Sequence, residues 1–177
     1  ICYNFCMKSF SYYYVFFIAL LILVFPSVSQ AAQNTTGYAW GENVGWLNVA
    51  TSSPATWGIN VTDTELTGYM YGENIGWISL NCSNTNSCGT NPYKVVNNGQ
   101  GRLSGYAWGE NVGWIDFGAT GARTWGVTIG TTTNIGEFLG YAYGENIGWI
   151  SFNCLNTGTC ASNPYKASTS WRTGDIS

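Results

Sequence analysis

Four glutamates recur in one sequence context, Gly-Glu-Asn, in a chain without histidine. Carboxylates are therefore its main candidates for acid–base chemistry, and two of them about 5 to 10 Å apart would suit glycoside hydrolysis. The four are Glu42, Glu73, Glu110 and Glu145. Because their contexts are almost identical, the sequence does not distinguish an acid from a nucleophile. Acceptance of hydrogen bonds from turn or neighbouring-strand amides is the favoured role, and we expect no catalytic residue.

Four cysteines follow the second and fourth of these motifs, in the matching segments NCSNTNSC and NCLNTGTC. The spacing favours two local disulfides, Cys82 with Cys88 and Cys154 with Cys160. Each bond closes a loop of about seven residues and stabilises the fold by roughly 2 kcal/mol. A zinc site is disfavoured, because histidine is absent and the spacing exceeds the usual two to four intervening residues. We expect no metal and no cofactor.

Four tryptophans follow the glutamates at a constant distance and supply the second kind of candidate chemistry. They are Trp46, Trp77, Trp114 and Trp149. Half-exposed indole rings beside Asn and Ser side chains can stack on sugar rings, so these tryptophans are candidate glycan-binding residues. Aromatic side chains also stabilise small β-proteins by packing. Packing in the core or between repeats is the favoured role, and a glycan-binding surface is the alternative.

The glutamates and tryptophans belong to one motif, GYAWGENVGWLNV, which begins at Gly37 and returns in near copies at Gly68, Gly105 and Gly140. Glycine and asparagine tolerate positive φ, so the Gly-Glu-Asn segment predicts a hairpin turn. In the strand after the turn, alternation predicts one core face and one face of Trp with Ser or Asp, as in an antiparallel sheet.

The length of the turn decides which side chains face each other across the hairpin. A four-residue loop places Ala39 opposite Trp46, whereas a five-residue loop places Trp40 opposite Trp46. We favour the four-residue loop, because a large ring beside small residues compensates for weak packing at glycine. A row of neighbouring indoles is the consequence of the five-residue alternative.

The repeat unit is about 70 residues long and is used twice. The first and third hairpins are followed by TWG, and the second and fourth by the cysteine loop and NPYK. Residues 32–104 and 105–177 are therefore the two expected β units. Strands are expected in the first unit near residues 37–40, 46–49, 57–61, 65–71, 77–80 and 93–96. The fold class is all-β and antiparallel, sandwich- or barrel-like, with about six short strands in each unit.

The N-terminal residues 1–31 have a different composition. Lys8 precedes an apolar run that ends at Pro26 and the small residues SVSQAA, a pattern typical of a secretory signal peptide cleaved after Ala31. A retained membrane anchor is the alternative, since the run approaches the lower limit of about 17 residues for a spanning helix. We expect secretion to the extracellular space or cell surface, with membrane contact only through the signal peptide before cleavage. Export also makes disulfide oxidation plausible.

The net charge of −3 and the lack of a basic patch argue against binding of nucleic acid. The strings GYAWGENVGWIDF and GYAYGENIGWISFNC resemble repeats of uncharacterised secreted and cell-surface bacterial proteins, in which GYAWSENIGWISF precedes a cysteine loop. The resemblance covers nearly all of residues 37–166. It implies export and a β-rich repeat module, but no activity and no functional residues.

The two ends of the repeat array are complementary. Two positions before the Gly-Tyr pair, three of the hairpins have Leu66, Leu103 or Phe138, whereas the first has Thr35. The segment 174–177 aligns with 101–104, which leads into the next repeat. This predicts head-to-tail strand addition between copies of the chain. The candidate assembly residues are Thr35, Thr36, Gly37, Tyr38, Gly174, Asp175, Ile176 and Ser177.

The sequence thus favours a secreted structural protein, a self-assembling extracellular filament subunit whose partner is itself. The alternative is a carbohydrate-binding adhesion module that recognises surface glycans through its Trp and Tyr faces. Catalysis has little support, because without histidine there is no Ser-His or Cys-His pair.

Overall fold

The structure, a computed structural model, describes residues 33–50, 57–118 and 124–174, all within the compact unit Ala32–Ser177. The expected signal peptide at 1–31 and the candidate assembly residues Asp175, Ile176 and Ser177 lie outside the described residues. The described part is all-β and antiparallel, as expected, with thirteen strands. Two short 3-10 helices, η2 (Cys82–Thr85) and η3 (Cys154–Asn156), stand in the cysteine loops.

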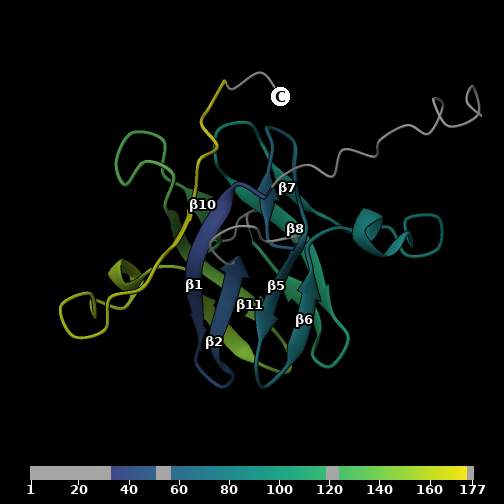
Figure 1. Cartoon of the computed structure of the whole chain (residues 1–177), viewed down its shortest axis with the longest axis horizontal. Coiled ribbons are helices and arrows are strands. Elements are labelled where there is room, and N and C mark those ends of the chain that lie inside the picture. The colour runs from purple at the N-terminus through teal and green to yellow at the C-terminus, as the bar shows by residue number, and fades with distance from the viewer. Residues whose placement is uncertain (1–32, 51–56, 119–123, 175–177) are drawn as a thin grey trace, which may run out of the picture. The chain divides into compact units, whose positions relative to one another are not determined.

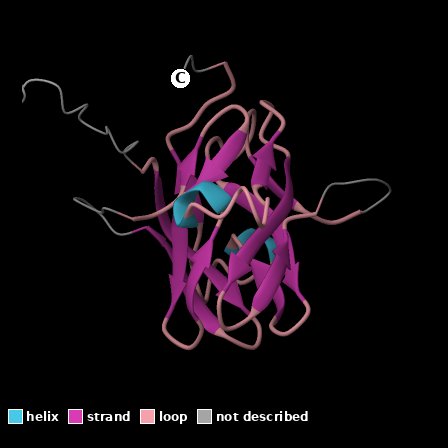
Figure 2. Cartoon of the chain, turned by 90° about the vertical axis from the view of Figure 1, so that its right-hand side faces the viewer, coloured by secondary structure: helices cyan, strands magenta, loops and turns pink. Residues whose placement is uncertain are grey.

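Eight strands form a closed antiparallel barrel made of the four hairpins (Figures 1 and 2). They are, in order around the barrel, β1 (Thr35–Gly41), β2 (Gly45–Ala50), β5 (Tyr69–Gly72), β6 (Gly76–Ser79), β8 (Leu103–Gly109), β9 (Gly113–Asp116), β11 (Phe138–Gly144) and β12 (Gly148–Ser151). β12 pairs back with β1, where Trp40 faces Ser151. The four hairpin turns gather at one end of this barrel, called here the hairpin end (Figure 2).

Five outer strands extend the barrel away from the hairpin end. They are β3 (Asn60–Val61), β4 (Glu65–Thr67), β7 (Val95–Asn97), β10 (Val127–Ile129) and β13 (Ala167–Thr169). β13 pairs with the start of β1, β7 with the start of β8 and β10 with the start of β11. Next to β3, the Asn34 side chain donates to the Val61 carbonyl and accepts from the Val61 amide, both at 2.8 Å, and so takes the place of a paired strand.

The long strands exchange partners at the glycine of each Gly-Tyr pair. These glycines have φ between +83° and +97°: Gly37, Gly68, Gly105 and Gly140. A Cβ atom on Gly105 would lie 2.3 Å from the Lys94 carbonyl oxygen, and one on Gly68 would lie 1.8 Å from the Gly58 carbonyl oxygen. Both the positive φ and the close approach of another backbone require glycine. The Gly-Tyr pair therefore marks the corner between the barrel and its outer strands.

The expected four-residue hairpin loop is wrong, and the five-residue alternative is correct. Gly41 pairs with Gly45, Trp40 with Trp46, and Ala39 with Leu47. This register directs Ala39 and Leu47 into the core and both tryptophans outward. The compensation argument failed because the side chain of Val44, in the same turn, already fills the space beside Gly41.

The core confirms the expected alternation of faces. Ile78 and Leu80 are fully buried, whereas Trp77, which precedes Ile78, is 45% exposed. The same holds after the third hairpin, where Ile115 and Phe117 are fully buried. Burial of such side chains contributes about 1.5 to 3 kcal/mol each.

The two expected units, residues 32–104 and 105–177, both contribute strands to this one barrel. The boundary between them falls inside the continuous strand β8, and each repeat supplies four neighbouring strands of the eight. Within the barrel the two units join at the β6–β8 and β12–β1 pairs, and the outer strands add the β7–β8 and β13–β1 pairs.

Candidate functional site

The Gly-Glu-Asn turns form a closed ring of hydrogen bonds at the hairpin end. Each asparagine donates its Nδ2 to a main-chain carbonyl oxygen of the neighbouring turn. The four bonds run from Asn43 to Ile147 (3.3 Å), from Asn74 to Val44 (3.0 Å), from Asn111 to Ile75 (3.1 Å) and from Asn146 to Val112 (3.1 Å). The accepting residues are themselves buried, 3 to 8% exposed, and their side chains belong to the core. The repeated motif thus closes the barrel.

One turn glutamate has the hydrogen-bonding role expected of all four. Glu42 Oε1 accepts a hydrogen bond from the Trp149 amide at 3.1 Å, and the Glu42 amide donates to the Trp149 carbonyl at 3.1 Å. These two hydrogen bonds join the first turn to the last hairpin. Among the residues that the structure describes, no cluster of three metal-ligating side chains occurs.

Both expected disulfides are confirmed. Cys82 bonds to Cys88 and Cys154 to Cys160, with Cα–Cα distances of 4.9 and 4.8 Å. In the first loop, the Cys82 amide donates to the Tyr93 carbonyl at 2.9 Å, and in the second the Cys154 amide donates to the Tyr165 carbonyl at 3.0 Å. The loops therefore hold one tyrosine each against the barrel.

The four motif tryptophans lie on the outside of the barrel rather than in its core. Trp46, Trp77, Trp114 and Trp149 are 42, 45, 46 and 36% exposed. The expectation that these tryptophans pack in the core is therefore wrong, because the five-residue register turns their rings outward. Stacking is present instead: Trp114 lies with its ring centroid 4.6 Å from Trp108 and 5.5 Å from Tyr93, both edge to face.

Each motif tryptophan forms an aromatic cluster with two rings of its own hairpin and a fourth ring from another segment, and the type of this fourth ring alternates around the barrel. Clusters on the first and third hairpins receive a tyrosine from a cysteine loop, Tyr165 against Trp46 and Tyr93 against Trp114. Clusters on the second and fourth hairpins receive a tryptophan instead. These contacts are Trp57 against Trp77 at 4.9 Å and Trp125 against Trp149 at 5.1 Å.

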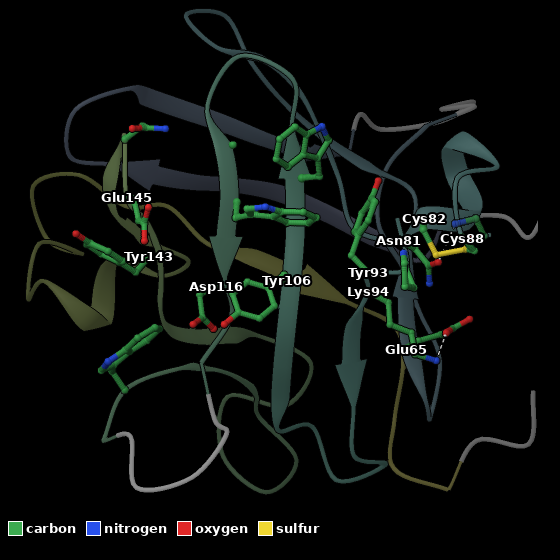
Figure 3. Close-up of a pocket in the computed structure, with 17 residues that line it drawn as sticks. Glu65, Asn81, Cys82, Cys88, Tyr93, Lys94, Tyr106, Asp116, Tyr143 and Glu145 are labelled. Carbon is green, nitrogen blue, oxygen red and sulfur yellow. Dashed lines mark hydrogen bonds and ion pairs between the residues drawn. A yellow bond between two sulfur atoms is a disulfide. The ribbon is translucent and has the colours of Figure 1, made fainter. Parts of the chain in front are cut away.

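A groove of about 1320 Å³ lies between the clusters of the third and fourth hairpins (Figure 3). Its aromatic lining residues are Tyr93, Tyr106, Trp108, Trp114, Trp125 and Tyr143. Three of these rings are well exposed: Tyr106 at 45%, Trp114 at 46% and Tyr143 at 37%. In Figure 3, Tyr143 and Glu145 lie on one side, the Cys82–Cys88 disulfide lies on the other, and Tyr106 with Asp116 lies between them. We call this region the aromatic groove.

The charged side chains of the aromatic groove are three carboxylates and one ammonium group. At the disulfide side, the Lys94 ammonium donates to Glu65 Oε2 at 2.9 Å, so these two charges offset each other. Asp116 and Glu145 add two carboxylates to the lining, and Asn146 adds an amide. Asp116 Oδ1 accepts from the Gly118 amide at 2.7 Å, which fixes the orientation of its carboxylate.

Sequence reasoning singled out Trp114, Glu145 and the disulfide of this groove but missed its other members. Tyr93 comes from NPYK and Trp125 from TWG, the two segments that alternate after the hairpins. The alternation of these two segments is the sequence signal that could have identified Tyr93 and Trp125 as members of the groove. The Tyr93 hydroxyl is buried and has no hydrogen-bond partner among the described residues, whereas the hydroxyl of its counterpart Tyr165 donates to Ser151 Oγ at 2.9 Å.

The candidate assembly residues at the start of β1 are paired with another strand of the same chain. Thr35 is 2% exposed, and its hydroxyl donates to the Ile59 carbonyl at 2.6 Å. β1 pairs with β2 along one edge and with β12 and β13 along the other, where Thr35, Thr36 and Gly37 face β13. Of the remaining candidate assembly residues, Tyr38 is exposed on the barrel and Gly174 is an exposed turn residue.

Comparison with protein-family models, curated proteins and solved structures finds no match for this chain. The resemblance to bacterial surface repeats therefore stays an expectation from sequence. No helix in the described part of the chain has the length and apolar character needed to cross a membrane.

Proposed function

We propose that this protein is a secreted carbohydrate-binding module of the cell surface, and that it binds a sugar chain in the aromatic groove without catalysing a reaction. The observation that carries the proposal is the exposure of rings on a rigid, closed barrel. Tyr106, Trp114 and Tyr143 expose 37 to 46% of their surface. Rigid aromatic side chains lose little conformational entropy when they bind a ligand.

The chemistry of the groove suits a sugar better than a purely apolar ligand. The C–H faces of a pyranose ring are apolar and pack on flat aromatic rings, while its hydroxyl groups need hydrogen-bond partners. Asp116, Glu145 and Asn146 supply carboxylate and amide oxygens beside the rings. A few placed polar groups in a mainly aromatic pocket are the usual basis of specificity.

The charge of the groove favours neutral sugars and amino sugars over uronic acids. Glu145 is an exposed carboxylate of the lining, and the one lysine of the lining is paired with Glu65. A carboxylate on the ligand would be repelled by Glu145, and an ammonium group would be attracted.

Export and surface location are part of the proposal. The signal-like segment before Ala32 supports secretion, and the two disulfides agree with an oxidising compartment. We further propose that residues 32–104 and 105–177 arose as tandem repeats and that surface glycans are the partners. Filament growth by strand addition has less support, because both edges of β1 are hydrogen-bonded within the chain.

Binding of residues 32–177 to a hexasaccharide panel tests the proposal. The panel contains β-linked glucose, N-acetylglucosamine, glucosamine, mannose, galactose, xylose and galacturonate. We expect binding to a neutral or amino member, weak binding to galacturonate, and a loss of at least about tenfold in affinity for Trp114→Ala, equivalent to 1.4 kcal/mol. Ile135→Ala is the matched control, since Ile135 is 53% exposed and does not line the groove. Binding to no member, or equal binding by Trp114→Ala, would contradict the proposal.

A further inference from the structure

From the internal symmetry of the barrel, we infer that the protein has a second sugar-binding surface on its opposite side and is therefore bivalent. This inference rests on the proposed function of the aromatic groove. The second surface centres on Trp46 and Tyr38 of the first hairpin, with Trp40 and Tyr165 beside them.

The ring geometry of the second surface repeats that of the aromatic groove. The indole pair Trp40 and Trp46 has a centroid distance of 4.7 Å, against 4.6 Å for Trp108 and Trp114. Trp46 lies 5.5 Å from Tyr165 and 6.3 Å from Tyr38. The corresponding distances from Trp114 in the groove are also 5.5 and 6.3 Å. The exposed fractions agree as well, 42% for Trp46 and 46% for Trp114.

The polar flank is repeated too. Lys166 pairs with Glu137 beside the Cys154–Cys160 loop, as Lys94 pairs with Glu65 beside the Cys82–Cys88 loop. Asn48 takes the position of Asp116, and its Oδ1 accepts from the Ala50 amide at 3.0 Å in the same local conformation. A pyranose chain therefore meets rings and hydrogen-bonding groups in the same arrangement on both surfaces.

The two surfaces lie on opposite sides because of the strand order. β1 and β8 are four positions apart in a closed ring of eight strands, so the hairpins that they begin are diametrically opposed. In Figure 1, the η2 loop in teal and the η3 loop in yellow-green project from opposite sides of the barrel. One sugar chain bound in each surface would be held apart by the width of the barrel, so two separate chains can be joined.

Titration calorimetry with each hexasaccharide of the panel tests the inference. We expect a stoichiometry of two for a neutral sugar that binds, one for Trp46→Ala, one for Trp114→Ala and none for the double variant. Beads that carry the matching polysaccharide should be aggregated by the unchanged protein and by neither single variant. Far-ultraviolet circular dichroism and melting verify that the variants are folded, and Tyr38→Ala with Tyr106→Ala is the second pair if a tryptophan variant does not fold.

The results separate the inference from the function on which it rests. A stoichiometry of one, abolished by Trp114→Ala and unchanged by Trp46→Ala, would leave the aromatic groove as a sugar site and overturn the second surface. Binding of no hexasaccharide by the unchanged protein would overturn both. Binding of a proline-rich peptide instead of sugar, a ligand that aromatic grooves also accept, would likewise overturn both.

Discussion

At the hairpin end, single residues decide how the barrel closes. The side-chain amide of each turn asparagine donates a hydrogen bond to the main chain of the neighbouring turn. Asn111, for example, donates to the Ile75 carbonyl oxygen at 3.1 Å. The next residue, Val112 in the same turn, points into the core and is 5% exposed. A turn with another polar residue in place of asparagine would leave a carbonyl without its partner, at a cost of about 1 to 3 kcal/mol where water cannot replace it.

Glu137 is the acidic residue whose pKa the fold lowers most clearly. A hydrogen bond from the Lys166 ammonium is the main cause, burial opposes it, and a hydrogen bond from Asn153 Nδ2 at 3.0 Å adds to it. A carboxyl group with a lower pKa in the folded state stabilises the protein above its unfolded pKa. That stabilisation is lost as the pH falls through the folded pKa.

We therefore predict that Glu137→Gln lowers the free energy of unfolding by about 1 kcal/mol above pH 5 and by progressively less as the pH is lowered towards 2. The estimate is kept small because the Lys166 side chain is 55% exposed. Urea unfolding at pH 7 and pH 2.5 measures the effect. Glu65→Gln is the control, since Glu65 makes its ion pair with Lys94 without a bond from Asn81. An equal loss of unfolding free energy at both pH values would show that the effect of Glu137→Gln comes from the shape of the side chain and not from its charge.

At the scale of elements, each long strand pairs with outer strands along its first residues and with barrel strands along the rest. β8 pairs with β7 up to Gly105 and with β6 and β9 beyond it. The corner at Gly105 has a φ of +85° and brings the Lys94 carbonyl oxygen into the space where a Cβ atom would be. The same corner carries Tyr106 into the aromatic groove.

We predict that Gly105→Ala destabilises the protein by at least about 2 kcal/mol, from the positive φ and from the displacement of β7. Thermal melting should then shift down by several degrees. Gly89→Ala is a suitable control, because no atom lies within 4 Å of the position its Cβ would take. Equal melting temperatures for the two variants would contradict the assigned role of the corner.

At the scale of the whole barrel, neither repeat closes alone. Residues 32–104 hold β1 to β7, but β6 and β7 both need β8, and β1 needs β12 and β13. A repeat by itself would expose unpaired strand edges and one half of the core. Closure by the second repeat removes these edges.

We accordingly predict that the fragment 32–104 is not a cooperatively folded monomer, and that mixing it with the fragment 105–177 restores the barrel. Near-ultraviolet circular dichroism of the tryptophans and size-exclusion chromatography measure the two parts of this prediction. The full unit 32–177 is the positive control. A single fragment that unfolds cooperatively as a monomer would show that the repeats are independent domains.

Local sequence determined a large part of the fold. The alternation that buried Ile78 and Leu80 and exposed Trp77 is a property of a few adjacent residues, as is the pairing of Cys82 with Cys88. Strand positions also followed from short β-branched and aromatic segments between turn residues. Such patterns can be read from sequence because the atoms that interact are close along the chain.

The register of the hairpins and the composition of the candidate site were decided only by the tertiary structure. Trp40 faces Trp46 because Val44 must enter the core and Asn43 must reach the Ile147 carbonyl, 104 residues away along the chain. Tyr93, Trp114 and Trp125 line one groove because the barrel closes and brings three separate segments together. The sequence by itself located the hairpin turns, the two disulfides and most strands, although the strand expected at 57–61 covers only Asn60–Val61. Closure determined which of them meet, because contacts between distant segments depend on the whole ring and not on any one repeat.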